Sequence, residues 1–366
     1  MTGINTALSP KIDFVPGGWT ADELHRDGNW TMTWSAEELT GLDSALAHCA
    51  QRGLNWRDLT RENVPLNQAL QEKLVRIAHE IEEGRGFVKI EGLPVARYSD
   101  AQLRLLWFGL GCHLGYPRFQ DNRGQLMREI KDEGGDLGSR HGRIAGGDGG
   151  GEFLSSKART YGPGELRFHT DRCDVVGLLC LGQAKSGGLS RIASSIAVHN
   201  AILEQRPDLL ELLYQPYTRS RLGEEDGGEI ATYDLPVFGL RDGKLTSHYS
   251  RTYIEAAQMQ PDAETLTPAQ WEAIDLLAAT AERLSYAMRL APGDIQLLNS
   301  HVTYHAREAF EDAPAEGFTR RLLRLWLAMP NSRALPEDHR VLWGDVAAGT
   351  LRGGIGQQAI GQDRRP

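Results

Sequence analysis

Apolar side chains recur at three- and four-residue spacing in two segments of the first third of the chain. Six residues follow this pattern in two groups: Leu74, Ile77 and Ile81, then Leu103, Leu106 and Leu110. Side chains at this spacing lie on one face of an α-helix, so both segments are predicted to be helices. Residues 87–91 (FVKIE) predict a short strand between them, ending at a Gly-Leu-Pro turn. Residues 1–115 are therefore expected to form a mainly helical N-terminal layer.

Short apolar runs replace this pattern in the second half of the chain. The predicted strands are residues 165–169, 175–181, 295–298 and 321–328, and the predicted helices include those that begin near Ser195, Pro207 and Thr267. Thr267, Pro268 and Gln270 match an N-cap, a first-turn proline and a capping box. Residues 301–317 are expected to connect the last two strands.

Glycine dominates residues 134–151, which hold nine glycines in eighteen positions. Glycine loses more backbone entropy on ordering than any other residue, so no packed element is predicted here. A disordered insertion is one interpretation. The segment lies shortly before His169-Thr170-Asp171, a candidate metal-binding motif, and this position favours a lid over a site. The tail, residues 348–366, has few apolar residues and is expected to be frayed.

Composition and charge narrow the class of protein. The chain has 366 residues, of which 40% are hydrophobic, with a formal net charge of −9 and a pI near 5.7. This acidic balance argues against a nucleic-acid partner, since phosphate binding usually needs a basic surplus. No run approaches the roughly 20 apolar residues that span a bilayer, and the N-terminus does not resemble a signal peptide. No membrane partner and a cytoplasmic location are therefore expected. Four cysteines without C-x-x-C spacing indicate reduced thiols.

Two histidine-containing segments could supply the ligands of one metal ion. In His169-Thr170-Asp171, at the end of a predicted strand, side chains at i and i+2 point to the same face and can reach a common ion. The tripeptide alone is weak evidence, because it occurs by chance and is often a surface pair. The segment NSHVTYHAR adds His301 and His305. Two histidines and one carboxylate make a facial triad, which leaves positions open for a bidentate co-substrate and O₂.

Two arginines share one face of the last predicted strand. Arg320 and Arg324 lie four apart in RRLLRLWL, opposite the leucines of that strand. Guanidinium groups in so apolar a strand need an anionic partner. An internal ion pair with Asp or Glu is one solution. The carboxylate of an oxoacid, bound by the planar fork of an arginine, is the functional alternative.

Four stretches carry a resemblance to a known family: ELRFHTDRCDVVGLLCL, SGGLSRIASSIAVHNAI, GDIQLLNSHVTYHAREAFED and RRLLRLWL. In order and spacing they resemble the taurine dioxygenase/TfdA-like family of Fe(II)/2-oxoglutarate oxygenases, the clavaminate synthase-like group. The resemblance implies an α+β fold, in which a double-stranded β-helix (jelly-roll) core at residues 164–330 is surrounded by helices. Residues 1–366 would then form a single oxygenase domain.

The resemblance also assigns the metal ligands. His169 and Asp171 would be the proximal ligands of Fe(II), and His305 the distal one. His301 competes for this role, but the H-A-R-x-A-F context of His305 is what resembles the family. His301 would then line or support the site.

The co-substrate residues follow from the same resemblance. Arg320 would bind the far carboxylate of 2-oxoglutarate, and Arg324 would support it. Ser190 lies where the family often has a threonine that hydrogen-bonds the co-substrate. Arg321 directly follows Arg320, so which of the two is the principal arginine stays open.

The implied activity is oxidation of an unactivated C–H bond, by default hydroxylation, with O₂ consumed and succinate and CO₂ released. A small polar or carboxylate-bearing substrate, such as an amino acid, is expected from the amides and guanidiniums near the predicted lid. The candidate substrate residues are Gln120, Asn122, Arg140, His141 and His301. A metal-dependent hydrolase and a non-catalytic jelly-roll binding protein are the alternatives. Desaturation or cyclisation, the pathway and a homo-oligomeric state stay open.

Overall fold

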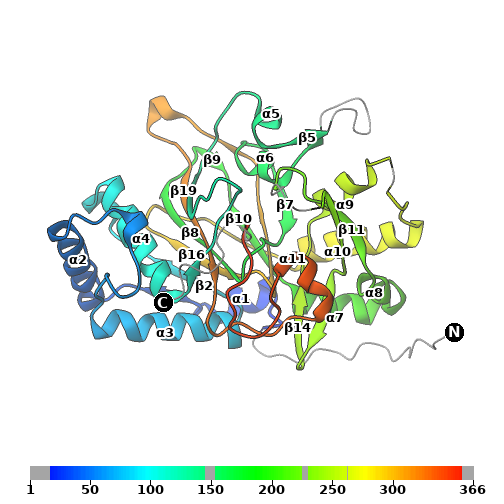
Figure 1. The fold of residues 1–366 in the computed structure, drawn as a ribbon, viewed down its shortest axis with the longest axis horizontal. Coiled ribbons are helices and arrows are strands. Elements are labelled where there is room, and N and C mark those ends of the chain that lie inside the picture. The colour runs from blue at the N-terminus through cyan, green and yellow to red at the C-terminus, as the bar shows by residue number, and fades with distance from the viewer. Residues whose placement is uncertain (1–16, 145–152, 225–229, 262, 357–366) are drawn as a thin grey trace.

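Two β-sheets face each other in the middle of the molecule, and helices cover the outer face of each (Figure 1). The structure is a computed structural model that describes residues 17–144, 153–224, 230–261 and 263–356. No helix within those ranges is long and apolar enough to cross a membrane. All four cysteines lie within them and are free thiols, as expected.

The larger sheet has seven strands in the order β1-β2-β16-β8-β19-β3, and β4 also pairs with β19. Its strands are β1 (Thr31–Thr33), β2 (Phe87–Glu91), β16 (Ile295–Asn299), β8 (Val175–Gly182), β19 (Arg321–Ala328), β3 (Tyr116–Pro117) and β4 (Met127–Ile130). The smaller sheet has the order β15-β10-β17-β7. Its strands are β15 (Tyr286–Met288), β10 (Ser190–Ser194), β17 (Thr303–Arg307) and β7 (Leu166–His169).

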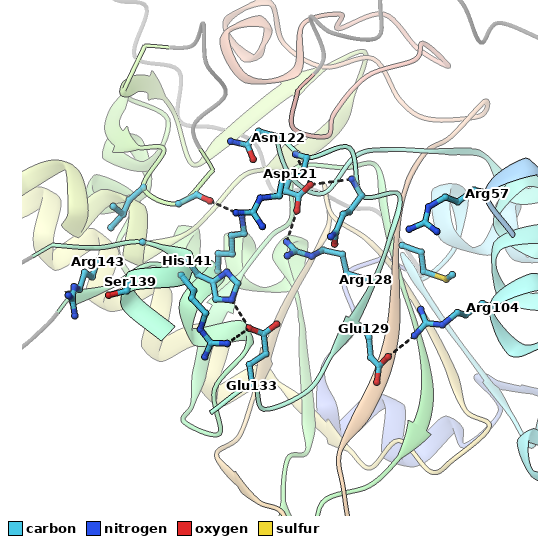
Figure 2. Close-up of a pocket in the computed structure, with 18 of the residues that line it drawn as sticks. Arg57, Arg104, Asp121, Asn122, Arg128, Glu129, Glu133, Ser139, His141 and Arg143 are labelled. Carbon is cyan, nitrogen blue, oxygen red and sulfur yellow. Dashed lines mark hydrogen bonds and ion pairs between the residues drawn. The ribbon is translucent and has the colours of Figure 1, made fainter. Parts of the chain in front are cut away.

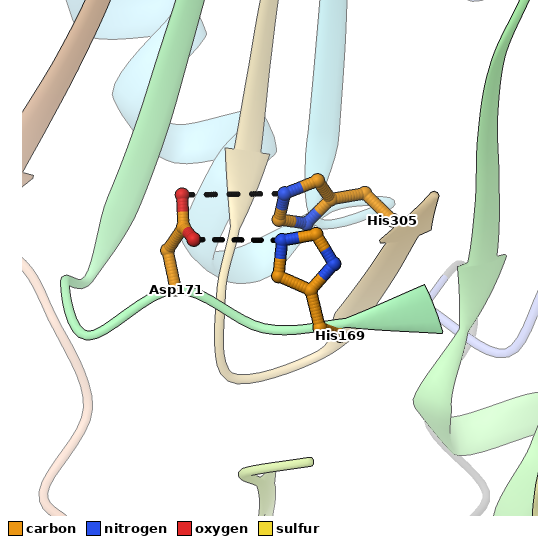
Figure 3. A group of neighbouring side chains, drawn as sticks. All are labelled: His169, Asp171 and His305. Atoms are coloured by element: carbon orange, nitrogen blue, oxygen red, sulfur yellow. Dashed lines mark ion pairs between the residues drawn. The ribbon is translucent and has the colours of Figure 1, made fainter. Parts of the chain in front are cut away.

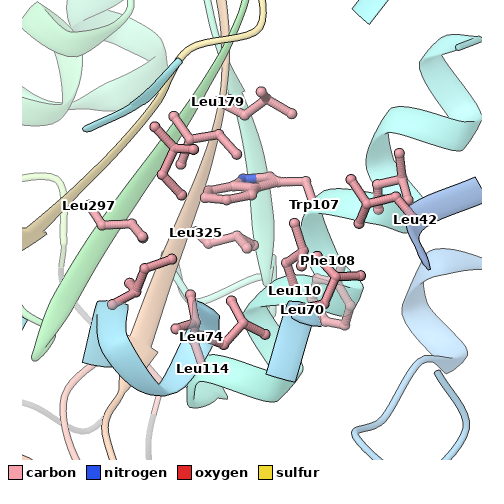
Figure 4. Packing of buried hydrophobic residues seen from close by; sticks show 14 of the residues in the cluster. Leu42, Leu70, Leu74, Trp107, Phe108, Leu110, Leu114, Leu179, Leu297 and Leu325 are labelled. Atoms are coloured by element: carbon pink, nitrogen blue, oxygen red, sulfur yellow. The ribbon is translucent and has the colours of Figure 1, made fainter. Parts of the chain in front are cut away.

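Strand β19 shows why the larger sheet is covered on both faces. Leu323, Leu325 and Leu327 alternate along the strand and pack against the N-terminal helices. These helices are α2 (Ala36–Gln51), α3 (Gln68–Glu83) and α4 (Asp100–Leu114). Leu322 and Trp326 point the other way, into the space between the two sheets. Figure 4 shows the first of these clusters, with Trp107 of α4 lying over the strands.

A second set of helices covers the outer face of the smaller sheet. It comprises α7 (Ser195–Gln205), α8 (Pro207–Leu213), α9 (Arg251–Gln258) and α10 (Pro268–Leu284). Phe168, Ala193 and Tyr304 turn their side chains to these helices. The side chains on the other face of these strands therefore point into the space between the two sheets, where they can form a site.

The remaining elements are short pieces at the margins of the two sheets. They are the pairs β11 (Tyr217–Ser220) with β12 (Thr232–Leu235), β13 (Phe238–Arg241) with β14 (Lys244–Ser247), β18 (Phe310–Glu311) with β9 (Ser186–Gly187), β5 (Arg143–Ile144) with β6 (Phe153–Leu154), and the helices α1 (Ala21–Asp27), α5 (Leu137–His141), α6 (Ser156–Thr160) and α11 (Arg340–Trp343).

Most elements predicted from apolar spacing are confirmed, including the Thr267 N-cap and its capping box at α10. The expectation that residues 301–317 only connect two strands is wrong, because they contain β17 and β18. Strand β17 reads TYHAR, and its polar side chains His305 and Arg307 face the space between the sheets. Such a strand lacks the apolar alternation on which the prediction depended.

The prediction that residues 134–151 contain no packed element is also wrong in part. Helix α5 forms within this segment because Asp136 caps it, accepting a hydrogen bond from the Ser139 amide. Gly142 then ends the helix at a φ of 104°, which only glycine adopts without strain. The segment from 145 onward lies outside the described residues. The lid function stays a prediction.

The tail is ordered as far as the structure describes it, so the expected fraying from residue 348 is wrong up to residue 356. Arg352 is fully buried, and its Nε donates a hydrogen bond of 2.7 Å to Asp174 Oδ1. His301 Nε2 lies 2.8 Å from the same oxygen. The Gly354 amide donates to the Arg172 carbonyl, and the Ile355 amide to the Phe119 carbonyl. The tail therefore ties together the loops that follow β3 and β7.

We expect the Arg352→Ala substitution to lower the free energy of unfolding by about 3–5 kcal/mol, because it leaves the buried Asp174 carboxylate without its cation. Urea denaturation followed by circular dichroism measures the change. Arg340→Ala is the matched control, since Arg340 pairs with Glu337 at the surface and should change nothing measurable. Equal denaturation midpoints for the two variants would refute the structural role of the tail.

Candidate metal centre and co-substrate site

Pairing of β7 with β17 places two histidines side by side. His169 ends β7 and lies directly across from His305 in the register of the two strands. Asp171 follows in the next loop, with its two carboxylate oxygens 3.7 Å from His169 Nε2 and 4.0 Å from His305 Nε2 (Figure 3). One ligand atom from each residue lies within 4.8 Å of the others. The structure thus brings together the three ligands predicted from the sequence.

Neighbouring groups fix the direction of these side chains. His169 Nδ1 donates to the Arg167 carbonyl at 2.8 Å, which leaves the lone pair of Nε2 directed at Asp171. Trp326 Nε1 donates to Asp171 Oδ2 at 2.9 Å, from the inner face of β19. This indole was not singled out from the sequence, because nothing in its sequence context marks it as a donor to the carboxylate.

Burial sets the protonation states that a metal ion requires. It lowers the pKa of His305 to about 3, with the neighbouring His169 adding to the effect, and it lowers the pKa of His169 as well. Burial alone would raise the pKa of Asp171, but Arg324 and the two histidines outweigh it and the net shift is downward. Neutral imidazoles beside a charged carboxylate form the donor set of a non-haem Fe(II) centre with open positions.

Arg320 is a buried cation with no carboxylate within ion-pair distance among the described residues, although the more distant Asp312 favours its charged form. Its side chain lies over the Phe310 ring, 5.3 Å from the centroid, and against the Cα side of Gly188. Burial lowers its pKa to about 10, so the group remains charged at neutral pH. Among the described residues, its Nη1 has no hydrogen-bond partner. A buried charge without a partner costs several kcal/mol, so this position is suited to an anionic ligand.

Ser190 connects the arginine to the metal ligands. It lies two residues before Ile192, which pairs with His305, so its hydroxyl is about 7 Å further along the same sheet. The hydroxyl donates to Gln296 Oε1 at 2.9 Å. Gln296 is fully buried in β16 and was missed in the sequence, although a glutamine in an otherwise apolar strand could have marked it.

The two other arginines of β19 are placed differently. Arg321 faces away from the site and forms ion pairs with Glu129 and Asp100 at 2.8 and 2.6 Å. Arg324 lies beside the triad, with Nη1 3.8 Å from Asp171 Oδ2. Its Nε donates to Gln120 Oε1 at 2.7 Å, so Gln120 holds this arginine in place.

A cavity of about 1040 Å³ is lined by Arg128, the residue that pairs with Arg324 across the sheet (Figure 2). Asn122, Arg140 and His141, three of the residues predicted to contact the substrate, line it. His301 does not belong with them. Both of its ring nitrogens lie at hydrogen-bond distance from buried groups, Nε2 from Asp174 and Nδ1 from the Thr246 hydroxyl. Of its two expected roles, lining or supporting the site, these contacts favour the supporting one, because Asp174 also binds Arg352 of the tail.

Comparison with known sequences identifies the family. The model of the family described as "Taurine catabolism dioxygenase TauD, TfdA family" matches residues 52–326. FR-33289 synthase from Streptomyces rubellomurinus is 31% identical over 344 residues, which covers 90% of this chain and 94% of the synthase. The taurine hydroxylase-like protein SAT17 from Stachybotrys chartarum is 29% identical, covering 84% of this chain and 77% of that protein.

Solved structures share the fold. Asparagine oxygenase in complex with Fe(II), 3-hydroxyasparagine and succinate has a TM-score of 0.62 at 17% identity, covering 88% of this chain and all of that one. The non-haem iron oxygenase OrfP with Fe and α-ketoglutaric acid has a TM-score of 0.56 at 15% identity, covering 88% of this chain and 99% of OrfP. The family model and the relative at 31% identity establish that the chain belongs to the TauD/TfdA family. The chain is a 2-oxoglutarate-dependent non-haem iron dioxygenase.

Proposed function

We propose that His169, Asp171 and His305 hold the iron, and that Arg320 and Ser190 bind the far carboxylate of 2-oxoglutarate. The observation that carries this assignment is the buried Nη1 of Arg320, which has no hydrogen-bond partner among the described residues. Arg320 directly precedes β19, whose residues Arg324 and Trp326 contact Asp171 of the triad. A carboxylate there would form the charge-assisted bonds that the guanidinium lacks. Arg321 is less suited to the role, because its charge is already compensated by Glu129 and Asp100.

The reaction that we propose is hydroxylation of an unactivated C–H bond in a small anionic molecule. When bound, the iron and 2-oxoglutarate supply the oxidation by O₂, with release of succinate and CO₂. The chain positions the ligands through Trp326 and the Arg167 carbonyl and places Arg324 between the triad and the cavity. The hydroxylated amino acids in the asparagine oxygenase and OrfP structures support hydroxylation as the reaction type.

The two alternatives explain less of the site. A zinc hydrolase could use the same three ligands with an activated water, but it gives Arg320 no partner. A binding protein without catalysis has no need for two neutral imidazoles directed at one carboxylate. The cytoplasmic location, the lack of a nucleic-acid partner and the oligomeric state stay predictions or open questions.

Anaerobic titration of the Fe(II)-loaded protein with 2-oxoglutarate tests the co-substrate assignment, through the visible charge-transfer band of the chelate. We expect Arg320→Ala to raise the apparent dissociation constant at least about 30-fold, because the carboxylate loses a buried charge-assisted partner worth about 2 kcal/mol or more. His305→Ala should abolish the band.

Arg321→Ala is the matched control and should leave the titration unchanged, since this arginine faces Glu129 and Asp100. If Arg321→Ala weakens binding and Arg320→Ala does not, the assignment of the arginine is wrong. If the folded, iron-loaded wild type shows no band, the oxygenase chemistry itself is refuted.

A second variant tests how the iron ligands are held. We expect Trp326→Phe to weaken Fe(II) binding by about 10–100-fold, because Asp171 Oδ2 loses the indole donor that orients it. Competition with a chromophoric chelator under anaerobic conditions measures the affinity. Trp107→Phe removes a comparable buried indole bond, to the Leu323 carbonyl outside the site, and should leave the affinity unchanged. Equal losses in both variants would mean that packing, not orientation, is responsible.

A further inference from the structure

The cavity beside Arg324 is strongly cationic in an otherwise acidic protein. The chain has a formal net charge of −9, yet seven arginines and lysines line this cavity against three acidic residues. The cationic residues are Arg57, Arg104, Arg123, Arg128, Arg140, Arg143 and Lys157. Several of them are labelled in Figure 2, where they approach the hollow from different elements. Such a surplus indicates an anionic ligand.

The acidic residues of the cavity are already engaged with arginines. Glu129 pairs with Arg104 at 2.6 Å, and it also binds Arg321 outside the cavity. Glu133 pairs with Arg140 at 3.1 Å and lies 2.9 Å from His141 Nε2.

Asp121, the third acid, lies 3.5 Å from Arg128. Glu224, next to the lining residue Gly223, accepts a hydrogen bond from the Tyr253 hydroxyl, and burial raises its pKa. Among the described residues that line the cavity, every carboxylate therefore faces a cation, and a substrate ammonium group would meet net repulsion.

Two cations at the inner end of the cavity are best placed to bind the ligand. Arg128, on β4, pairs across the sheet with Arg324, which itself lies beside Asp171. The side chain of Arg128 is only 10% exposed, and its Nη1 forms no hydrogen bond among the described residues, with Asp121 Oδ2 3.5 Å away. Within the described part of the chain, Lys157 on α6 binds a backbone carbonyl, that of Gly223, at 3.1 Å. Burial lowers the pKa of both groups, and repulsion adds to it, from Arg324 for Arg128 and from Arg128 for Lys157.

We propose that this cavity binds the substrate through a doubly charged tetrahedral oxyanion, a phosphonate or a phosphate monoester, held by Arg128 and Lys157. The inference rests on the proposed function, since the C–H bond that is oxidised must lie between this anion and the iron, next to Arg324. A carboxylate offers two coplanar oxygens and one charge. The cations here come from a strand and a helix, and a group with three oxygens and two charges can meet both while also reaching Arg324.

Isothermal titration of the anaerobic Fe(II)- and 2-oxoglutarate-loaded enzyme at pH 8 tests this inference. The probes are propylphosphonate, ethyl phosphate, propanesulfonate, butyrate and 2-aminobutyrate, which share a short chain and differ in the head group. We expect the two dianions to bind at least about 10-fold more tightly than the sulfonate, the carboxylate and the amino acid. A preference between propylphosphonate and ethyl phosphate would identify the source of the oxyanion.

Variants locate the binding site. Arg128→Gln and Lys157→Met should each weaken propylphosphonate binding at least about 10-fold, and Arg128→Lys should recover part of the loss. Arg206→Gln is the control, because this arginine is not among the lining residues and pairs with Asp208 and Glu272; it should change binding less than about 2-fold. Circular dichroism checks that each variant is folded.

The outcomes separate the two proposals. Equal binding of butyrate or 2-aminobutyrate, or unchanged binding in Arg128→Gln and Lys157→Met, would overturn the oxyanion inference while leaving the charge-transfer band of the wild type intact. A wild type without that band would instead overturn the proposed function, whatever its preference among the anions.

Discussion

The pairing of β7 with β17 is the contact on which the site depends. It sets His169 opposite His305, and Asp171 completes the group only because the loop after β7 turns back beneath Trp326 of the facing sheet. The two sheets must therefore pack correctly before three ligands can meet. The apolar cluster between the sheets stabilises this packing, and the helices on both outer faces exclude water from the strands that carry the ligands.

Charges inside the molecule fall into two groups. Arg352 and Arg333 are buried with carboxylate partners, Asp174 and Glu82, and hold the fold together. Arg320 and Arg128 are nearly as buried, but their Nη1 atoms form no hydrogen bond among the described residues, and the one carboxylate near that of Arg128, Asp121, lies 3.5 Å away. Because desolvating a guanidinium without a counter-charge is costly, the stabilising partner of the second group is best sought in the ligands.

The sequence was most informative where local spacing decides the structure. Helices α3 and α4 follow their apolar spacing, and the α10 N-cap follows from a capping box. The two-residue spacing of His169 and Asp171 predicted that they lie close together, although Asp171 lies in the loop after β7 and not in the strand. Strand β17 was missed, since its inward side chains are polar and their burial depends on a partner strand far away in the chain. The roles of Gln120 and Gln296 likewise depend on long-range contacts, with Arg324 and Ser190, which no local pattern reveals.

The contacts of the tail affect when, during synthesis, the loop of the candidate metal site becomes fully ordered. Arg352 and Gly354 follow the last strand of both sheets, yet they contact Asp174 and the Arg172 carbonyl in the loop that carries Asp171, the proposed carboxylate ligand. During synthesis that loop is made long before the residues that neutralise and brace it. In a nascent chain, the loop that carries Asp171 therefore lacks these contacts until residues 352–354 have emerged. Capacity for oxidative chemistry would arise late, when the surrounding protein is already folded and shielded from it.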